Sequence, residues 1–287
     1  MSGEPRPASS SDAIDRPIFI VSTPRSGSTL LFDQLAQAPD VYAVHGESHS
    51  IIEGLAELGP AAHDWHSNRL TSDDATSRMV AALSQRFYRA LKNRDGHGAS
   101  GRVRMLEKTP KNALRVPFFA AAFPDSRFLY LYRDPRESLA SMMEAWASGY
   151  FRTYPDLPGW TGYPWSLLLV PGWRELIGKP LPEIVAHQWQ ATTETLLDDL
   201  EDLPRDRVES GSYADLLADP QGEVERLAGR LGLGWDRTIG PNLPLSKVTV
   251  SPPRSDKWRR LEPMIEAVMS IVAKADERAR AFLAART

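Results

Sequence analysis

Cysteine is absent from this chain of 287 residues. That absence excludes disulfide bonds, thiolate metal sites and a cysteine nucleophile, and it is in keeping with a reducing compartment. Long hydrophobic runs are also missing: no stretch of about 18 or more apolar residues predicts a membrane-spanning helix. The first residues are polar, rich in proline and serine, and without the apolar centre of a signal peptide. We therefore expect a flexible tail over residues 1–16 and a cytoplasmic location.

An excess of charge of one sign is missing as well. The formal net charge is −3, so no overall basic field argues for nucleic acid or an acidic membrane as a partner. Apolar residues make up 42% and charged residues 25%, the balance of an ordinary soluble protein. Neither an internal repeat nor a clear linker divides the chain. We expect one domain over residues 17–287.

Short apolar runs alternate with helical patterns along the chain. Strands are predicted within residues 17–22, 102–110, 127–135 and 206–220, with a further short strand before Glu47. Helices are predicted after the first and third of these runs, over residues 50–58 and 73–94, and from Pro182 onward. This alternation predicts an α/β fold with a central parallel sheet.

Residues 148–182 differ in texture, because proline, glycine and aromatic residues dominate there. Long irregular segments of this kind are usually lids or binding loops. Aromatic side chains suit an apolar acceptor, although they would equally serve to pack a lid on the core. The candidate acceptor contacts are Trp160, Tyr163, Trp165 and Trp173. His187, on the following helix, is a further candidate to face the lid.

The stretch "STPRSGST", residues 22–29, follows the first strand and opens a helix. It resembles the phosphate-binding loop G-x-x-x-x-G-K-[ST], but Ser28 stands where the lysine belongs. Without that lysine, the loop suits one compact tetrahedral anion held by backbone N–H groups, hydroxyls and a guanidinium. The predicted anion-binding residues are Thr23, Pro24, Arg25, Ser26, Gly27, Ser28 and Thr29. The alternative is an ordinary strand–turn–helix with polar turn residues.

A second element, "YRDPRESLAS", places Arg133 at the carboxyl end of a strand and Ser141 on the helix behind it. Open α/β sheets bind ligands at the carboxyl ends of their strands, so these two residues are candidates to hold a second phosphate. The alternative is that Arg133 only pairs with a neighbouring acid. Asp134 is interpreted as a helix cap, with a magnesium-binding acid as the competing reading.

Together these elements resemble the sulfotransferases that use 3′-phosphoadenosine 5′-phosphosulfate (PAPS). "TPRSGSTLL" resembles their 5′-phosphosulfate loop and "RDPRESLAS" their 3′-phosphate element. "SYADLLADP" resembles the stretch that lies near the adenine, which implies that role for Tyr213. "PPRSDKWRR" resembles their C-terminal basic segment, and Arg254 is its best match to the 3′-phosphate contact. The resemblance implies PAPS as donor, adenosine 3′,5′-bisphosphate as product, and no metal.

The same resemblance suggests the catalytic groups. Lys108, in "LEKTPKN", resembles the family's lysine and is the leading cation for the transferred group. Many members have a histidine base two residues after that lysine, where Pro110 stands here, so the base must lie elsewhere. Glu47, in "VHGESHS", resembles the glutamate base of the tyrosylprotein branch and of polyketide-type members. His49 is the second candidate, as the base or as the group that orients Glu47; a helix-capping role for Glu47 is the plain alternative.

The predicted reaction is in-line transfer of a sulfuryl group to a hydroxyl of a small-molecule, lipid or polyketide-like acceptor, free or carrier-bound, in secondary metabolism. A protein tyrosine is less favoured, because that branch carries a membrane anchor. Two other functions stay open. A P-loop nucleotide kinase or NTPase would need a lysine at position 28, and a catalytically silent nucleotide-binding module would keep the loops without turnover.

Overall fold

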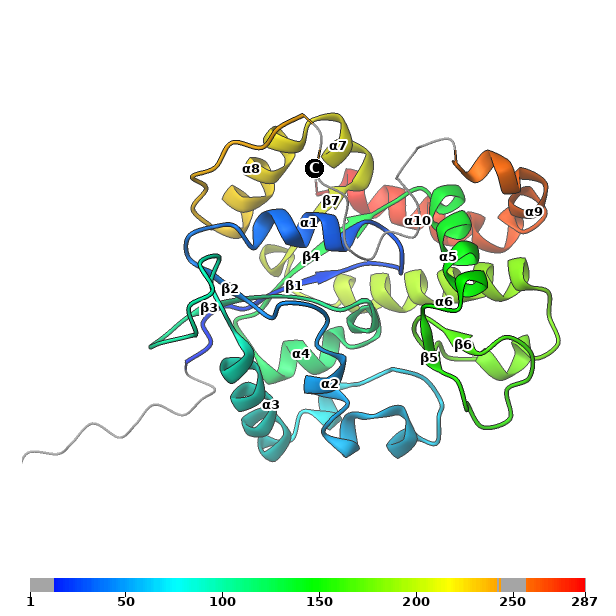
Figure 1. Ribbon diagram of the computed structural model, residues 1–287, viewed down its shortest axis with the longest axis horizontal. Helices are drawn as coiled ribbons and strands as arrows, with labels where there is room; N and C mark the ends of the chain where they lie inside the picture. The colour runs from blue at the N-terminus through cyan, green and yellow to red at the C-terminus, as the bar shows by residue number, and fades with distance from the viewer. Residues whose placement is uncertain (1–12, 242, 244–256, 287) are drawn as a thin grey trace, which may run out of the picture.

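The computed structural model describes residues 13–241, 243 and 257–286. Within them, five parallel strands form a central sheet in the order β2-β3-β1-β4-β7. The strands are β1 (Ile18–Val21), β2 (Val41–Ala43), β3 (Arg104–Lys108), β4 (Arg127–Tyr132) and β7 (Val208–Ser212). The predicted α/β fold, a single domain with a central parallel sheet, is confirmed (Figure 1).

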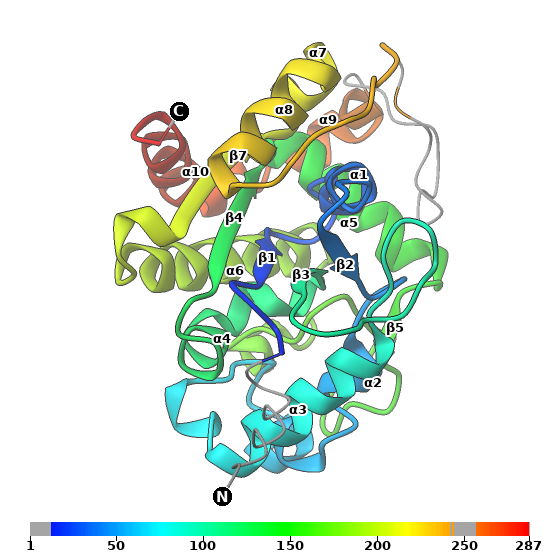
Figure 2. The ribbon, with the colours of Figure 1, turned by 90° about the vertical axis from the view of Figure 1, so that its left-hand side faces the viewer.

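Apolar residues build the sheet because both of its faces are covered by helices. Side chains alternate along a strand, so Ile18 and Ile20 face one layer while Phe19 and Val21 face the other. The first layer contains α1 (Ser28–Leu35), α7 (Tyr213–Ala218) and α8 (Pro220–Leu231). The second contains α3 (Ser77–Ala90), α4 (Val116–Ala122), α6 (Leu181–Glu201) and α10 (Met269–Ala284). Figure 2 shows the two layers on either side of the strands. Each fully buried Ile or Phe stabilises the fold by roughly 1.5–3 kcal/mol.

The helix after β4 follows its sequence signals closely. In α5 (Pro135–Ser148), the Asp134 carboxylate accepts a hydrogen bond of 2.9 Å from the Arg136 N–H, and proline occupies the first turn. Gly149 ends the helix at a φ of 68°, a left-handed conformation that glycine adopts readily. The interpretation of Asp134 as a cap is therefore confirmed.

The region between β2 and β3 is less helical than predicted. The helix expected over residues 50–58 is a short α2 (His49–Ile52) followed by the 3₁₀ turns η1 (Ala56–Leu58) and η2 (Pro60–His63). The helix expected over 73–94 is η3 (Ser72–Asp74) and α3, whose start is set by the Thr76 hydroxyl accepting from the Met79 N–H. The first predicted helix is interrupted between Ile52 and Ala56, where Gly54 lies, and Thr76 caps a new start within the second.

Segment 148–182 is packed against the domain. It contains the antiparallel pair β5 (Arg152–Tyr154) and β6 (Trp165–Ser166) and the turn η5 (Trp173–Leu176). The side chains of Trp165 and Trp173 are fully buried, with ring centroids 5.8 Å apart. Trp146 of α5 and Trp160 complete this indole cluster, 5.3 and 4.8 Å from Trp165.

The ends of the described chain also belong to the fold. Residues 13–16, expected in the tail, run beside the start of β3: buried Ile14 pairs with Val103, and the Asp15 N–H donates to the Val103 carbonyl at 2.8 Å. The remaining elements are η4 (Pro110–Leu114), η6 (Arg205–Arg207), η7 (Lys257–Leu261) and α9 (Glu262–Glu266). Of the helices in the described part of the chain, none has the length and apolar character to cross a membrane.

Candidate active site

A cavity of about 1030 Å³ lies at the carboxyl edge of the sheet. Residues that directly follow each of the five strands line it, which is where open parallel sheets place their ligands. They include Arg25 after β1, Glu47 after β2, Lys111 after β3, Arg133 after β4 and Tyr213 after β7. The topology therefore brings five distant parts of the sequence to one site.

The loop between β1 and α1 supplies one wall. Pro24, Arg25, Gly27, Ser28 and Thr29 line the cavity, and the N-terminus of α1 begins there. Thr23 and Ser26 are buried inside the loop instead, where their hydroxyls lie 2.6 Å apart and brace the turn. All seven residues from Thr23 to Thr29 were predicted to bind the anion, and five of them line the cavity.

Gly27 is the position in this loop that admits no side chain. Its φ of +86° is left-handed, and a Cβ there would lie 2.3 Å from the ring of Tyr213. The backbone of the anion loop and the Tyr213 ring are thus in direct contact. A ligand that touches one also reaches the other.

The second predicted anion element meets the loop. The Arg25 Nε donates to the Ser141 hydroxyl at 3.1 Å, and Arg133 Nη1 donates to the Arg25 carbonyl at 2.8 Å. The Arg133 guanidinium lies 4.3 Å above the centre of the Tyr213 ring. Glu137 also pairs with Arg133, at 2.9 Å, so the predicted alternative of a neighbouring acid holds at the same time. Burial and the neighbouring Arg133 charge lower the pKa of Arg25.

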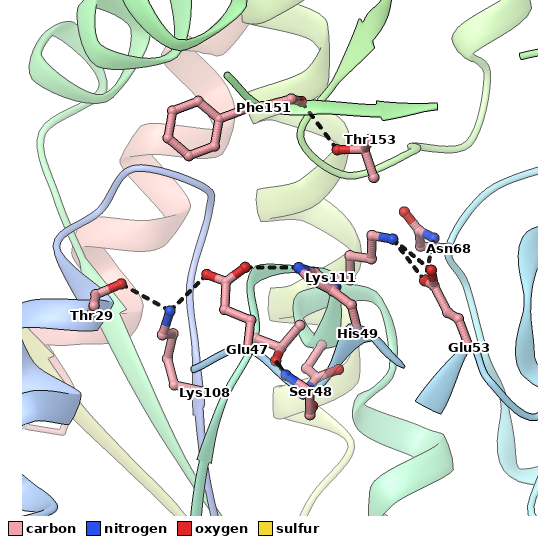
Figure 3. A network of polar contacts seen from close by, with 12 residues as sticks. Thr29, Glu47, Ser48, His49, Glu53, Asn68, Lys108, Lys111, Phe151 and Thr153 are labelled. Atoms are coloured by element: carbon pink, nitrogen blue, oxygen red, sulfur yellow. Dashed lines mark hydrogen bonds and ion pairs between the residues drawn. The ribbon is translucent and has the colours of Figure 1, made fainter. Parts of the chain in front are cut away.

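A chain of polar contacts forms the next wall (Figure 3). The Lys108 ammonium donates to the Thr29 hydroxyl and to Glu47 Oε1, both at 2.8 Å. His49 Nε2 lies 2.7 Å from the other oxygen of Glu47. Lys108 is 3% exposed, whereas the Glu47 side chain is 31% exposed, so the carboxylate is the accessible member of this pair. All three predicted catalytic residues therefore lie together, beside the anion loop.

The charge state of Glu47 follows from these neighbours. Burial alone would raise the pKa of its carboxyl group, but the hydrogen bond from His49 and the charge of Lys108 outweigh burial and lower the pKa to about 2. Glu47 is therefore an ionised hydrogen-bond acceptor at neutral pH.

Lys111 and Glu53 are among the charged wall residues that were not predicted from the sequence. The Lys111 ammonium lies 2.9 and 2.7 Å from the two oxygens of Glu53 and 4.6 Å from the centre of the Tyr154 ring. Burial lowers the pKa of Lys111 to about 8, although the Glu53 charge opposes this. The four-residue spacing between His49 and Glu53 was the available signal, because residues so spaced share one side of a helix.

The predicted acceptor contacts lie elsewhere. Trp165 and Trp173 are in the core, Trp160 packs against them, and Tyr163 is 60% exposed. Neither these four residues nor His187, part-exposed on α6, are among the described residues that line the cavity. Apolar rings lose more contact with water in the indole cluster than on a cavity wall, and we do not carry these residues forward as acceptor contacts. Segment 148–182 reaches the cavity through Tyr150, Phe151, Arg152, Thr153, Leu167 and Leu168. Arg254 lies outside the described residues.

Comparison with known proteins matches this geometry to a family. The sequence model described as "Sulfotransferase family" matches residues 17–237, more than half of the chain. Protein-tyrosine sulfotransferase A of Caenorhabditis elegans is 23% identical over 265 residues, covering 88% of this chain and 61% of the relative. The protein-tyrosine sulfotransferase of Drosophila melanogaster is 24% identical over 265 residues, covering 88% and 47%. This chain thus spans less than two thirds of the length of either relative.

The fold has a solved counterpart as well. The crystal structure of sulfotransferase STF1 from Mycobacterium tuberculosis H37Rv superposes with a TM-score of 0.51 and 16% sequence identity, covering 92% of this chain and 78% of that one. At this level of identity the likeness concerns the fold, including the parallel sheet at whose edge the cavity lies.

Proposed function

The chain belongs to the sulfotransferase family, and from this premise we propose that it transfers a sulfuryl group from PAPS to a hydroxyl group of an acceptor. One observation carries the proposal. The anion loop, the Arg133–Ser141 element and Glu47 all border a single cavity, and Lys108 lies directly behind Glu47 and Thr29, bonded to both. A nucleotide with anionic groups at both ends of its ribose and a hydroxyl acceptor would therefore meet in one place.

The residues present fit such a nucleotide. The N–H groups at the start of α1 and the hydroxyls of Ser28 and Thr29 suit the 5′-phosphosulfate. Arg133 and Ser141 suit the 3′-phosphate, and Tyr213, which lines the same cavity, suits a place beside the adenine. Charge-assisted hydrogen bonds of this kind contribute roughly 1.5–3 kcal/mol each.

PAPS, when bound, supplies the sulfuryl group and a stable phosphate leaving group. Glu47 is placed to accept the proton of the acceptor hydroxyl, because it is ionised and accessible from the cavity. Lys108 is placed to stabilise negative charge beside Thr29. An anion next to Thr29 competes with Glu47 for the Lys108 ammonium, and weakening that pair makes Glu47 more basic. His49 holds the second carboxylate oxygen and so orients Glu47.

For the acceptor, we propose a small-molecule, lipid or polyketide-like hydroxyl compound. Phe151, Leu167 and Leu168 give the cavity an apolar side beyond the charged pairs. A volume of about 1030 Å³ is at the top of the roughly 300–1,000 Å³ usual for ligand pockets, and it leaves room for an acceptor beside the nucleotide. A protein tyrosine is the second candidate acceptor, favoured by what the two relatives are named for.

The test is transfer of label from ³⁵S-labelled PAPS to a long-chain alcohol, a phenol and a tyrosine-containing peptide. We expect wild-type turnover on at least one of them and a loss on the order of 100-fold or more in Glu47→Gln and Lys108→Ala. Both variants should still be stabilised by adenosine 3′,5′-bisphosphate in thermal unfolding. Full turnover in both variants would refute the assigned roles.

Thermal unfolding also separates this proposal from a P-loop kinase or NTPase. Adenosine 3′,5′-bisphosphate at about 100 times its Kd should stabilise the protein by about 2.7 kcal/mol, whereas ATP with magnesium should not. The reverse result would favour the kinase. Nucleotide binding with no transfer to any acceptor would favour a silent binding module.

A further inference from the structure

A fully buried carboxylate lies directly behind the proposed catalytic pair. Glu107 precedes Lys108 on β3 and is 1% exposed. Because successive side chains of a strand point to opposite faces, Lys108 points toward Thr29 and Glu47, which line the cavity, while Glu107 points to the other side of the sheet. Glu107 is not among the described residues that line the cavity, so it does not touch the proposed substrates.

The Glu107 carboxylate accepts three hydrogen bonds. Its Oε1 accepts from the Ser48 hydroxyl and the Thr109 hydroxyl, each at 2.6 Å, and its Oε2 accepts from the Asn112 amide. The Ser48 N–H in turn donates to the Thr109 hydroxyl at 2.8 Å. Ser48, Thr109 and Asn112 are completely buried. Every contact that Glu107 makes here is to a donor, which is the pattern of a carboxylate acceptor.

Ser48 is the residue next to Glu47, as Glu107 is next to Lys108, so two neighbouring pairs of residues face each other. On the cavity side, Glu47 pairs with Lys108; on the buried side, Ser48 pairs with Glu107. Two consecutive residues of the loop after β2 are therefore bound to two consecutive residues at the end of β3. The cavity-side pair is solvent-accessible through Glu47, whereas the buried pair is out of water, where a hydrogen bond is stronger and an unpaired group costs more.

We propose that Glu107 is a positioning residue for the transfer reaction. Through Ser48 it fixes the loop that carries Glu47 against the strand end that carries Lys108, and so sets the distance between base and cation. This inference rests on the proposed function, since it assigns Glu107 a role in that same site. An apolar residue at position 107 would fill the same space but could not hold Ser48 in one orientation, because dispersion contacts are not directional.

The experiment compares Glu107→Gln, Ser48→Ala and the double variant with wild type, using labelled PAPS and the best acceptor of the panel above. An amide at position 107 places a donor opposite the Asn112 amide, and Ser48→Ala removes the link itself. We expect kcat to fall on the order of 10-fold or more in each, because small misplacement of a catalytic group is costly. The KM for PAPS and the Kd of adenosine 3′,5′-bisphosphate should stay within about 3-fold, since the anion loop and Arg133 are untouched. The double variant should be no slower than the worse single one, because both changes break one link.

Asp199→Asn is the matched control. Asp199, on α6, is another buried carboxylate. It pairs with Arg69 and is not among the described residues that line the cavity. It should lower thermal stability without changing kcat. A wild-type kcat in both Glu107→Gln and Ser48→Ala would overturn this inference but not the proposed function. Losses of kcat that add fully in the double variant would do the same. A wild-type protein that transfers no sulfuryl group would overturn the proposed function and this inference with it. Should Glu107→Gln not fold, Ser48→Ala alone decides the question.

Discussion

Glu47 should make the stability of this protein depend on pH in a window that the structure specifies. Its pKa is lowered from 4.5 to about 2 in the folded protein. A lowered pKa contributes stability that is present above the unfolded value and is lost as pH falls through the folded value. At about 1.36 kcal/mol per pKa unit, the contribution at neutral pH is about 3 kcal/mol. This is an upper limit, because the side chain is 31% exposed and solvent screens its partners.

Most of that window is experimentally accessible. Between about pH 6 and pH 3.5, the wild type should lose about 1.4 kcal/mol of unfolding free energy through Glu47. Glu47→Gln carries no titrating group there and should not show this part of the loss. For a domain of this size the difference corresponds to about 2–3 °C in melting temperature. Urea unfolding at several pH values measures the free energy and thermal unfolding measures the melting temperature, both followed by circular dichroism.

Lys108→Ala provides the second arm of the test. The ammonium is one of the groups that hold Glu47 ionised, and removing it leaves the burial that raises the pKa. In a Lys108→Ala background, the extra pH dependence contributed by Glu47 should shrink. The reasoning would be refuted if wild type and Glu47→Gln lost stability in parallel from pH 6 to 3.5, or if Lys108→Ala left their difference unchanged.

Three further predictions concern the anion loop, its partner arginine and the indole cluster. Gly27→Ala places a Cβ 2.3 Å from the Tyr213 ring at a φ of +86°, so adenosine 3′,5′-bisphosphate should bind at least about 10-fold more weakly by calorimetry; unchanged affinity would show that the loop tolerates a shift. Arg133→Ala removes the donor to the Arg25 carbonyl and one proposed phosphate contact, and it should weaken the same ligand by about 10- to 100-fold while kcat at saturating PAPS changes little. Trp173→Ala should destabilise the protein by roughly 3–5 kcal/mol in urea unfolding and leave the KM of the acceptor within about 2-fold; a large rise in KM would return this residue to the acceptor site.

Much of the site was readable from the sequence, because its parts are local. The anion loop is one strand–turn–helix junction of eight consecutive residues, and its glycine and hydroxyl residues are enough to predict it. Arg133 and Ser141 lie at the end of one strand and on the helix that follows it, so their approach to a common ligand follows from a single junction. Asp134 and Pro135 predicted the start of α5, because a helix cap is also a local feature of the sequence.

Other features depended on which segments the topology brings together. Glu47 and Lys108 were identified separately, but they are 61 residues apart, and only the adjacency of β2 and β3 makes them partners. The pairing of Ser48 with Glu107 could not be predicted from the sequence around either residue, since a carboxylate at the end of a strand is usually expected to be exposed to solvent. The tryptophans of segment 148–182 show the same limit. A segment rich in tryptophan is compatible with a cavity wall and with a core, so composition cannot distinguish the two. The packing of β6 and η5 against α5 and α6 placed Trp165 and Trp173 in the core, where burial of the rings is greater.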